Sequence, residues 1–155
     1  MWKKIKPYVI SIAIALAVGA LSALLTRNNM NVYDTLTRPA LSPPMWVFPV
    51  VWTILFILMG ISAAMVYCER DNTDVSGALK IYALQLIVNF FWSIIFFNLQ
   101  AYLFAVVWLG VLLLLILLMI ISFYRIRKAA AYLQLPYLAW SVFAFYLTLM
   151  IYILN

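Results

Sequence analysis

The chain has 155 residues, of which 69% are hydrophobic and 9% are charged, and it carries a formal net charge of +6. A typical soluble domain is about half apolar and a quarter charged, and a chain this short has too little interior to bury the surplus. The composition therefore excludes a water-soluble globule and predicts an integral membrane protein.

Uncharged runs divide the chain into membrane-spanning segments. No charge occurs in residues 7–26, 39–68, 81–124 or 129–155, and one helical crossing needs about 20 apolar residues. The run 81–124 is long enough for two crossings, and it breaks at Asn98-Leu99-Gln100. We expect a single all-α domain over residues 1–155, a bundle of five transmembrane helices with spans near 6–26, 45–68, 79–98, 101–124 and 131–153.

The first span has a second interpretation. Lys3, Lys4 and Lys6 resemble the basic start of a signal peptide, and Ala20-Leu21-Ser22 is a weak cleavage site. The apolar stretch is long for a signal peptide and continues to Thr26, which favours a retained helix. A row of small residues on this span, Ala15, Gly19 and Ala23, would permit close approach of another helix, either within the bundle or from a second protomer. We favour a helix of the same bundle.

The loop 27–44 is the one substantial connection. Pro39, Pro43 and Pro44 stiffen the approach to the second span, and Pro44 is expected in its first helical turn with Ser42 as the cap. With Tyr33, Leu36, Leu41 and Trp46, this segment resembles a lid over the bundle. The alternative is an ordinary connector whose Trp46 lies at the membrane interface.

The basic residues predict the orientation of the chain. Eight of the ten would lie on the side of the N-terminus, and only Arg27 and Arg38 on the other. By the positive-inside rule this places the N-terminus in the cytoplasm and the C-terminus outside. The positive charge would then meet anionic lipid headgroups, so we expect membrane lipid and no nucleic acid as a partner.

The reactive groups that the chain lacks exclude several function classes. Histidine is absent, and the four acidic residues all fall between the predicted spans. A Ser-His-Asp triad, a histidine-ligated metal or haem, and the intramembrane carboxylate of proton-coupled pumps are therefore excluded. We expect no metal site, no required cofactor and no conventional catalytic motif.

Aromatic and weakly polar side chains recur on one face of three spans. Asn89 and Trp92 share a face of the third span, and Tyr137, Trp140 and Ala144 follow helical spacing on the fifth. At about 1.5 Å per residue, Trp52 on the second span lies at the same depth as Trp92, in the outer half of the bilayer. These faces either pack helix against helix or wall a cavity suited to a flat aromatic ligand.

Three separated motifs resemble the TspO/MBR family, also called translocator protein, tryptophan-rich sensory protein or peripheral benzodiazepine receptor. They are the run from Arg38 to Trp52 with Met59-Gly60, the run Asn89-Phe90-Phe91-Trp92 with Ile95-Phe96-Phe97, and Leu135-Pro136-Tyr137-Leu138-Ala139-Trp140. The resemblance covers the whole chain and is closest to bacterial members. It implies a five-helix bundle, commonly a homodimer.

The resemblance also implies a function. Family members bind porphyrins such as protoporphyrin IX and synthetic benzodiazepine-site ligands beneath the first loop, and bacterial members are linked to tetrapyrrole sensing, regulation and light-dependent porphyrin breakdown. Porphyrin would be a ligand or substrate, and photochemical breakdown would be the only enzymatic activity. Trp52 and Trp140 would stack on the macrocycle and donate electrons to its excited state. The ligand-binding residues expected by match of motif are Trp46, Trp52, Asn89, Trp92, Tyr137, Trp140, Ala144 and Leu147.

The chain departs from animal members of the family at its end. No basic residue follows Tyr152, so the cholesterol motif of the animal proteins is not reproduced. Two functions other than a receptor stay open at this point: a passive transporter of porphyrin or lipid, since no coupling residue is present, and an assembly partner whose pocket is incidental.

Overall fold

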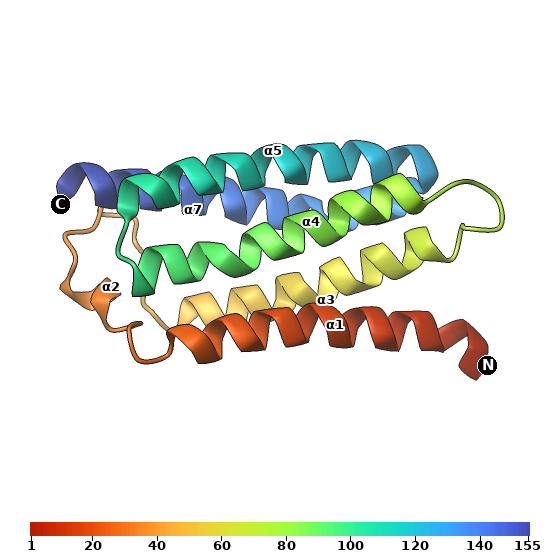
Figure 1. The fold of residues 1–155 in the computed structure, drawn as a ribbon, viewed down its shortest axis with the longest axis horizontal. Helices are drawn as coiled ribbons and strands as arrows, with labels where there is room; N and C mark the ends of the chain where they lie inside the picture. The colour runs from red at the N-terminus through yellow and green to blue at the C-terminus, as the bar shows by residue number, and fades with distance from the viewer.

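The computed structural model describes residues 1–155 as a bundle of long antiparallel helices (Figure 1). Five helical segments are long and apolar enough to cross a membrane. The helices are α1 (Trp2–Thr26), α2 (Val32–Thr35), α3 (Val47–Tyr67), α4 (Ser76–Ser93), the π-helical turn η1 (Ile94–Asn98), α5 (Tyr102–Ile126), α6 (Lys128–Leu133) and α7 (Leu135–Leu154). The all-α class is therefore confirmed.

The outside of the bundle is apolar along its length. On α5, Val107, Leu114 and Ile121 recur at seven-residue intervals and are all exposed. A soluble helix would place polar side chains on such a face, because exposed apolar surface is unfavourable in water. The exposed stripe is the surface that acyl chains cover, so this is a multi-pass membrane protein.

Two breaks set the lengths of the last three spans. Between α4 and α5 the chain turns within a few residues, and Gln100 adopts a positive φ of 50° to make the turn, a conformation that is uncommon for residues other than glycine. The last span is divided into α6 and α7 at Gln134, and Pro136 occupies the first turn of α7, where the missing N–H of proline does not cost a helical hydrogen bond.

A polar side chain precedes the third span, at the end of the bundle opposite the segment 27–46. The Asp74 carboxylate accepts hydrogen bonds from the Ser76 backbone N–H at 2.9 Å and from the Ser76 hydroxyl at 2.8 Å. These hydrogen bonds, together with Lys80, lower the pKa of the Asp74 carboxyl. The group therefore helps to start α4 where the chain leaves the short polar turn 69–75.

Glycines bring α1 and α3 into close contact. A Cβ on Gly60 would lie 2.6 Å from the Ile12 backbone, and a Cβ on Gly19 would lie 2.5 Å from the Phe56 ring. Ala15, one turn before Gly19, is fully buried. The small-residue row of the first span thus packs within the bundle, as expected.

The helices form a ring that is open at one end. α1 packs on α3 and α4, α4 on α5, and α5 on α7. α3 closes the ring mainly through α6, where the Ser62 hydroxyl donates to the Ala130 carbonyl at 2.7 Å, and it meets α7 only sparsely. α3 and α7 therefore diverge toward the end of the bundle at which α2 lies (Figure 1).

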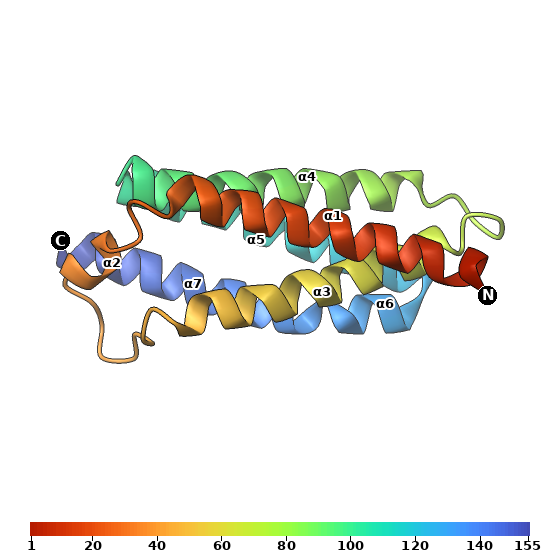
Figure 2. The ribbon, with the colours of Figure 1, turned by 90° about the horizontal axis from the view of Figure 1, so that it is seen from below.

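The segment 27–46 covers that open end. The short helix α2 lies across it, close to the C-terminus of α7 (Figures 1 and 2). Two polar contacts hold it: the Asn155 side chain hydrogen-bonds the backbone of Thr37 at 2.9 and 3.2 Å, and the Asn29 amide donates to Asn98 at 2.7 Å. We call residues 27–46 the lid.

The junction between the lid and α3 differs from the sequence prediction. α3 begins at Val47 with Trp46 in the cap position, so Pro44 lies before the helix and Ser42 does not cap it. Instead, the Pro43 carbonyl accepts a hydrogen bond from the Tyr33 hydroxyl at 2.9 Å. The prolines therefore shape the lid rather than the first turn of the helix.

Candidate functional site

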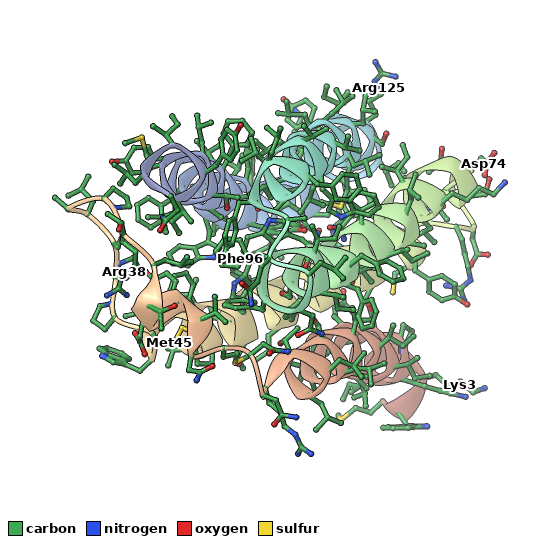
Figure 3. All side chains as sticks on the ribbon, turned by 60° about the vertical axis from the view of Figure 1, so that its left-hand side comes forward. Lys3, Arg38, Met45, Asp74, Phe96 and Arg125 are labelled. Atoms are coloured by element: carbon green, nitrogen blue, oxygen red, sulfur yellow. The ribbon has the colours of Figure 1, made fainter.

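A cavity of about 140 Å³ lies beneath the lid, between α1, α3, α4 with η1, and α7. It occupies the space where α3 and α7 diverge. Met45 and Phe96 mark this end of the bundle in Figure 3. The lining residues carry no charge; they are Gly19, Ser22, Ala23, Thr26, Met30, Tyr33, Met45, Phe48, Pro49, Trp52, Phe56, Asn89, Trp92, Ser93, Phe96, Phe97, Ala144, Leu147, Thr148 and Ile151.

Aromatic rings form two of its walls. On the α4 side, Trp92 and Phe96 stack with ring centroids 5.3 Å apart and planes at 25°. On the α3 side, Trp52 and Phe56 lie 5.7 Å apart with planes at 32°. Each pair spans one helical turn, and all four rings line the same space, a composition that suits aromatic contact with a planar ligand.

A hydrogen-bonded trio of side chains begins at the cavity wall with Asn89 and continues behind it. The Asn89 amide nitrogen donates to the Tyr137 hydroxyl at 2.7 Å, and that hydroxyl donates to the Gln85 amide oxygen at 2.7 Å. All three side chains are buried. The amide oxygen of Asn89 makes no side-chain hydrogen bond, so a residue that lines the cavity keeps one acceptor for a ligand.

The roof of the cavity is held by Tyr33. Its ring is buried, lies 5.2 Å from Phe48 in an edge-to-face arrangement, and carries the Arg38 guanidinium at 4.4 Å on its other side. Arg38 also reaches Asp34 at 3.7 Å. These contacts make the lid a structured cover whose inner surface is aromatic and whose outer surface is charged.

The structure brings together five of the eight residues expected to bind a ligand. Trp52, Asn89, Trp92, Ala144 and Leu147 all line the cavity. These five come from α3, α4 and α7, which are distant in sequence, so the three aromatic and polar faces converge as their estimated depths indicated.

The other three expected residues lie outside the cavity wall. Tyr137 is behind Asn89, and its ring meets that of Trp52 at 6.2 Å. Trp140 contacts Phe48, with centroids 5.8 Å apart, and its indole N–H has no hydrogen-bond partner. Trp46 is 67% exposed at the start of α3.

Sequence reasoning missed the contribution of α1. Gly19, Ser22, Ala23 and Thr26 form one wall of the cavity. The small-residue row of the first span was the available signal, but it predicted only close packing. Small side chains leave room for a ligand only where the facing helix does not fill the space. The sequence of α1 alone does not show which helix faces it.

The cavity is smaller than most ligand sites, which enclose about 300–1,000 Å³. It can hold a small ring, since an apolar cavity of roughly 150 Å³ accommodates benzene. The indole N–H of Trp92 is buried without a partner, which is costly in an apolar setting. The cavity therefore has a polar group in its wall that the protein itself does not satisfy.

Comparison with known proteins identifies the family. The model of the TspO/MBR family matches residues 11–154. The tryptophan-rich protein TspO of Chlorobaculum tepidum is 38% identical over 157 aligned positions, which cover 100% of this chain and 99% of that protein.

Other relatives match less of the chain. The tryptophan-rich sensory protein of Cereibacter sphaeroides is 35% identical over 72% of this chain and 69% of its own length. The translocator protein of Bos taurus is 30% identical over 81% of this chain and 76% of its own length. The family model and these relatives agree with the motifs of the sequence, and the chain belongs to the TspO/MBR family.

Proposed function

We propose that this protein is a membrane receptor that binds tetrapyrroles such as protoporphyrin IX in the cavity beneath the lid. The observation that carries the proposal is the arrangement of Trp52, Trp92 and Asn89 around one uncharged space. The porphyrin would be the ligand, and the protein would need no resident cofactor.

The chemistry of the lining suits a metal-free macrocycle. Stacked indole and phenyl rings offer attraction to a flat π-system, each aromatic pair contributing about 0.5–1.5 kcal/mol beyond burial of area. The free oxygen of Asn89 can accept a hydrogen bond from a pyrrole N–H. The lining has no histidine or cysteine to serve as an axial ligand to a bound metal. The other axial-ligand types that it contains are Met30, Met45 and Tyr33, and the Tyr33 hydroxyl already donates to the Pro43 carbonyl.

Binding a porphyrin requires the closed site to widen. The lid is held to the rest of the bundle by few polar contacts, chiefly Asn155 to Thr37 and Asn29 to Asn98. α3 and α7 already diverge beneath it. We propose that the lid lifts and the rings of Phe48 and Phe56 move to admit the ligand, after which the lid closes over it.

The biological role that we propose is sensing and regulation of tetrapyrrole levels. A relative bears the name tryptophan-rich sensory protein and another the name translocator protein, and the proposal extends the first of these to this chain. Synthetic benzodiazepine-site ligands, which are also flat and aromatic, would compete for the same cavity. The protein would act as a homodimer in a bacterial cell membrane, with the lid outside and the N-terminus in the cytoplasm.

Binding is tested with purified protein in detergent. Protoporphyrin IX should quench tryptophan fluorescence saturably, and Asn89→Leu or Trp92→Leu should weaken the apparent affinity about tenfold, a loss of one hydrogen bond or one stacking surface. Trp2→Leu is the matched control, because Trp2 is exposed at the opposite end. Equal affinity of the three variants and the unmodified protein would refute the site.

The role of the lid is tested by loosening it. Asn155→Ala removes both hydrogen bonds to Thr37, and we expect the association rate of protoporphyrin IX, measured by stopped-flow fluorescence, to rise severalfold. Thr35→Ala is a suitable control, since its hydroxyl bonds only the Val32 carbonyl within α2. An unchanged rate in Asn155→Ala would show that the ligand enters by another route.

Light-dependent breakdown of porphyrin is the further activity that we propose for the bound state. Trp52 lines the cavity and Trp140 lies behind Phe48, so electron donation from Trp140 would cross one ring. The double variant Trp52→Phe, Trp140→Phe should abolish protein-dependent loss of porphyrin absorbance under illumination while binding persists. Loss at the unmodified rate would leave the protein a receptor without photochemistry.

A further inference from the structure

A second cavity lies at the end of the bundle opposite the lid. It is an open groove of about 640 Å³ between the beginning of α1, the end of α3 and the beginning of α4. The lining residues are Lys3, Lys6, Pro7, Ile10, Ser11, Ile14, Ala63, Ala64, Tyr67, Arg70, Leu79 and Tyr82. It shares no residue with the cavity beneath the lid, and the proposed function does not use it.

Three cations surround the mouth of this groove. Lys3, Lys6 and Arg70 are exposed, and none forms an ion pair, because the single salt bridge of the structure joins Arg38 to Asp34 in the lid. Figure 3 shows Lys3 projecting from the end of α1. Arg70 is held in place, its guanidinium 4.2 Å above the Tyr67 ring and 3.1 Å from the Tyr67 carbonyl. The mouth thus presents unneutralised and partly fixed positive charge.

The groove becomes apolar away from the mouth. Ile10 and Ile14 lie one turn apart on α1, and Ala63 and Ala64 of α3 form the opposite side. The alanines are too small to close the gap, while the isoleucines are exposed to the bilayer side. A strip of this kind, running along the helices from a charged mouth, fits a flexible hydrocarbon chain.

A buried hydroxyl lies between the charged and apolar parts. Tyr82 lines the groove and is 7% exposed, and the polar group beside its hydroxyl is that of Ser11. A buried hydroxyl is unfavourable in an apolar medium unless its hydrogen bonds are made. Ser11 supplies a second hydroxyl to the same groove. The two together provide hydrogen-bonding groups at the level of a lipid glycerol backbone.

We propose that this groove is a binding site for an anionic phospholipid, such as phosphatidylglycerol. The phosphate would sit among Lys3, Lys6 and Arg70, the glycerol and ester oxygens would meet Tyr82 and Ser11, and one acyl chain would lie along Ile10, Ile14 and Ala63. Each basic residue near a membrane surface contributes about fivefold to attraction for anionic lipid. The bound lipid would hold together the ends of α1, α3 and α4 that lie farthest from the lid.

The site is tested with matched charge variants. Purified full-length protein is equilibrated in mixed micelles of phosphatidylglycerol and phosphatidylcholine, and the retained lipid is measured by native mass spectrometry. The triple variant Lys3→Gln, Lys6→Gln, Arg70→Gln should lower the affinity for phosphatidylglycerol at least about tenfold. The control Arg125→Gln, Arg127→Gln, Lys128→Gln makes the same charge change at the same end of the bundle but outside the groove, and it should retain the lipid.

Three results would overturn the proposal. Equal losses in both triple variants would reduce the effect to general attraction by surface charge. Equal retention of phosphatidylcholine and phosphatidylglycerol by the unmodified protein would remove the selectivity for an anion. If glycerol phosphate displaced phosphatidylglycerol at an equal concentration, the acyl chain would contribute nothing to the affinity, and the apolar strip would not be part of the site.

A second variant keeps the test independent of charge. Tyr82→Phe removes only one hydroxyl, so it should fold normally, and it should lower phosphatidylglycerol affinity severalfold without changing protoporphyrin IX binding. An unchanged lipid affinity in this variant contradicts the placement of the glycerol backbone. Because protoporphyrin IX reports on the other cavity, failure of the lipid site and failure of the proposed receptor function give different results.

Discussion

The Tyr137 hydroxyl links two amide side chains inside the membrane. It accepts from Asn89 and donates to Gln85, both at 2.7 Å, and Tyr137 itself is only 1% exposed. An amide in hydrocarbon is stable only when it is hydrogen-bonded. The hydroxyl therefore fixes the orientation of Asn89, which leaves the oxygen of that side chain available to the cavity.

Removing this hydroxyl should destabilise the protein and disturb the site together. Tyr137→Phe leaves the Asn89 nitrogen and the Gln85 oxygen without partners, so we expect the free energy of unfolding, measured by SDS titration, to fall by about 1–2 kcal/mol. Affinity for protoporphyrin IX should also fall. Tyr124→Phe, at an exposed tyrosine, should change neither quantity. A stable Tyr137→Phe protein with normal binding would contradict this role of the hydroxyl.

At the scale of the elements, the contact between α1 and α3 decides how wide the cavity is. Gly60 lets the Ile12 backbone approach, and Gly19 makes room for the Phe56 ring that lines the cavity. In a membrane, helices associate through close packing because lipid is as apolar as the side chains. Glycine here is required by proximity and not by backbone conformation.

Two glycine-to-alanine substitutions separate packing from helix propensity. Gly60→Ala places a methyl group 2.6 Å from the Ile12 backbone, so α1 must move away, and we expect a loss of roughly 1–3 kcal/mol of unfolding free energy. Gly110→Ala on α5 meets only the Phe145 ring at 3.7 Å, and the gain in helix propensity should stabilise the protein by about 0.5–1 kcal/mol. Thermal unfolding in detergent measures both, and the same sign for the two variants would refute the packing explanation.

For the whole molecule, the two ends of the bundle differ in character. One end carries the lid and the cavity beneath it; the other carries Lys3, Asp74 and Arg125 (Figure 3) and the basic groove. The distribution of lysine and arginine predicts that this second end faces the cytoplasm. Ligands of the lid cavity would then reach it from outside the cell or from the outer leaflet.

The lone cysteine allows the orientation to be measured directly. Cys68 is partly exposed at the end of α3, away from the lid, so a membrane-impermeant maleimide should label it in intact cells only after permeabilisation. In a Cys68→Ser background, Leu41→Cys places a thiol on the lid at a position that is 71% exposed, and it should be labelled without permeabilisation. The reverse pattern would invert the topology.

Much of the fold follows from the sequence because the membrane imposes a simple rule. Backbone groups in lipid must be paired within their own helix, so each long uncharged run had to become a helix. The break at Asn98-Leu99-Gln100 was recognisable because polar residues interrupt an apolar run. The break at Gln134 was missed, since Pro136 is compatible with the first turn of a new helix as well as with a kink.

Helical periodicity and depth also predicted part of the site. They indicated that Trp52, Asn89, Trp92 and Ala144 converge in the outer half of the membrane, and the structure places these four residues around one cavity. Leu147 also lines the cavity, but it was expected only from the resemblance to the family. Periodicity could not show that Trp140 and Tyr137 lie outside the cavity lining. They share a face of α7 with residues that line the cavity, although they themselves pack behind side chains of its wall. Only the crossing of the helices distinguishes the two.

The sequence alone determined that this is a five-span α-helical membrane protein with its polar groups confined to loops and a few intramembrane positions, because hydrophobicity and helix length are local properties. The tertiary structure decided where space remains between the helices. α3 and α7 diverge beneath the lid, and α1, α3 and α4 leave a groove at the opposite end. Cavities arise from side chains that are distant in sequence and fail to fill the gap between them, so no local pattern encodes them.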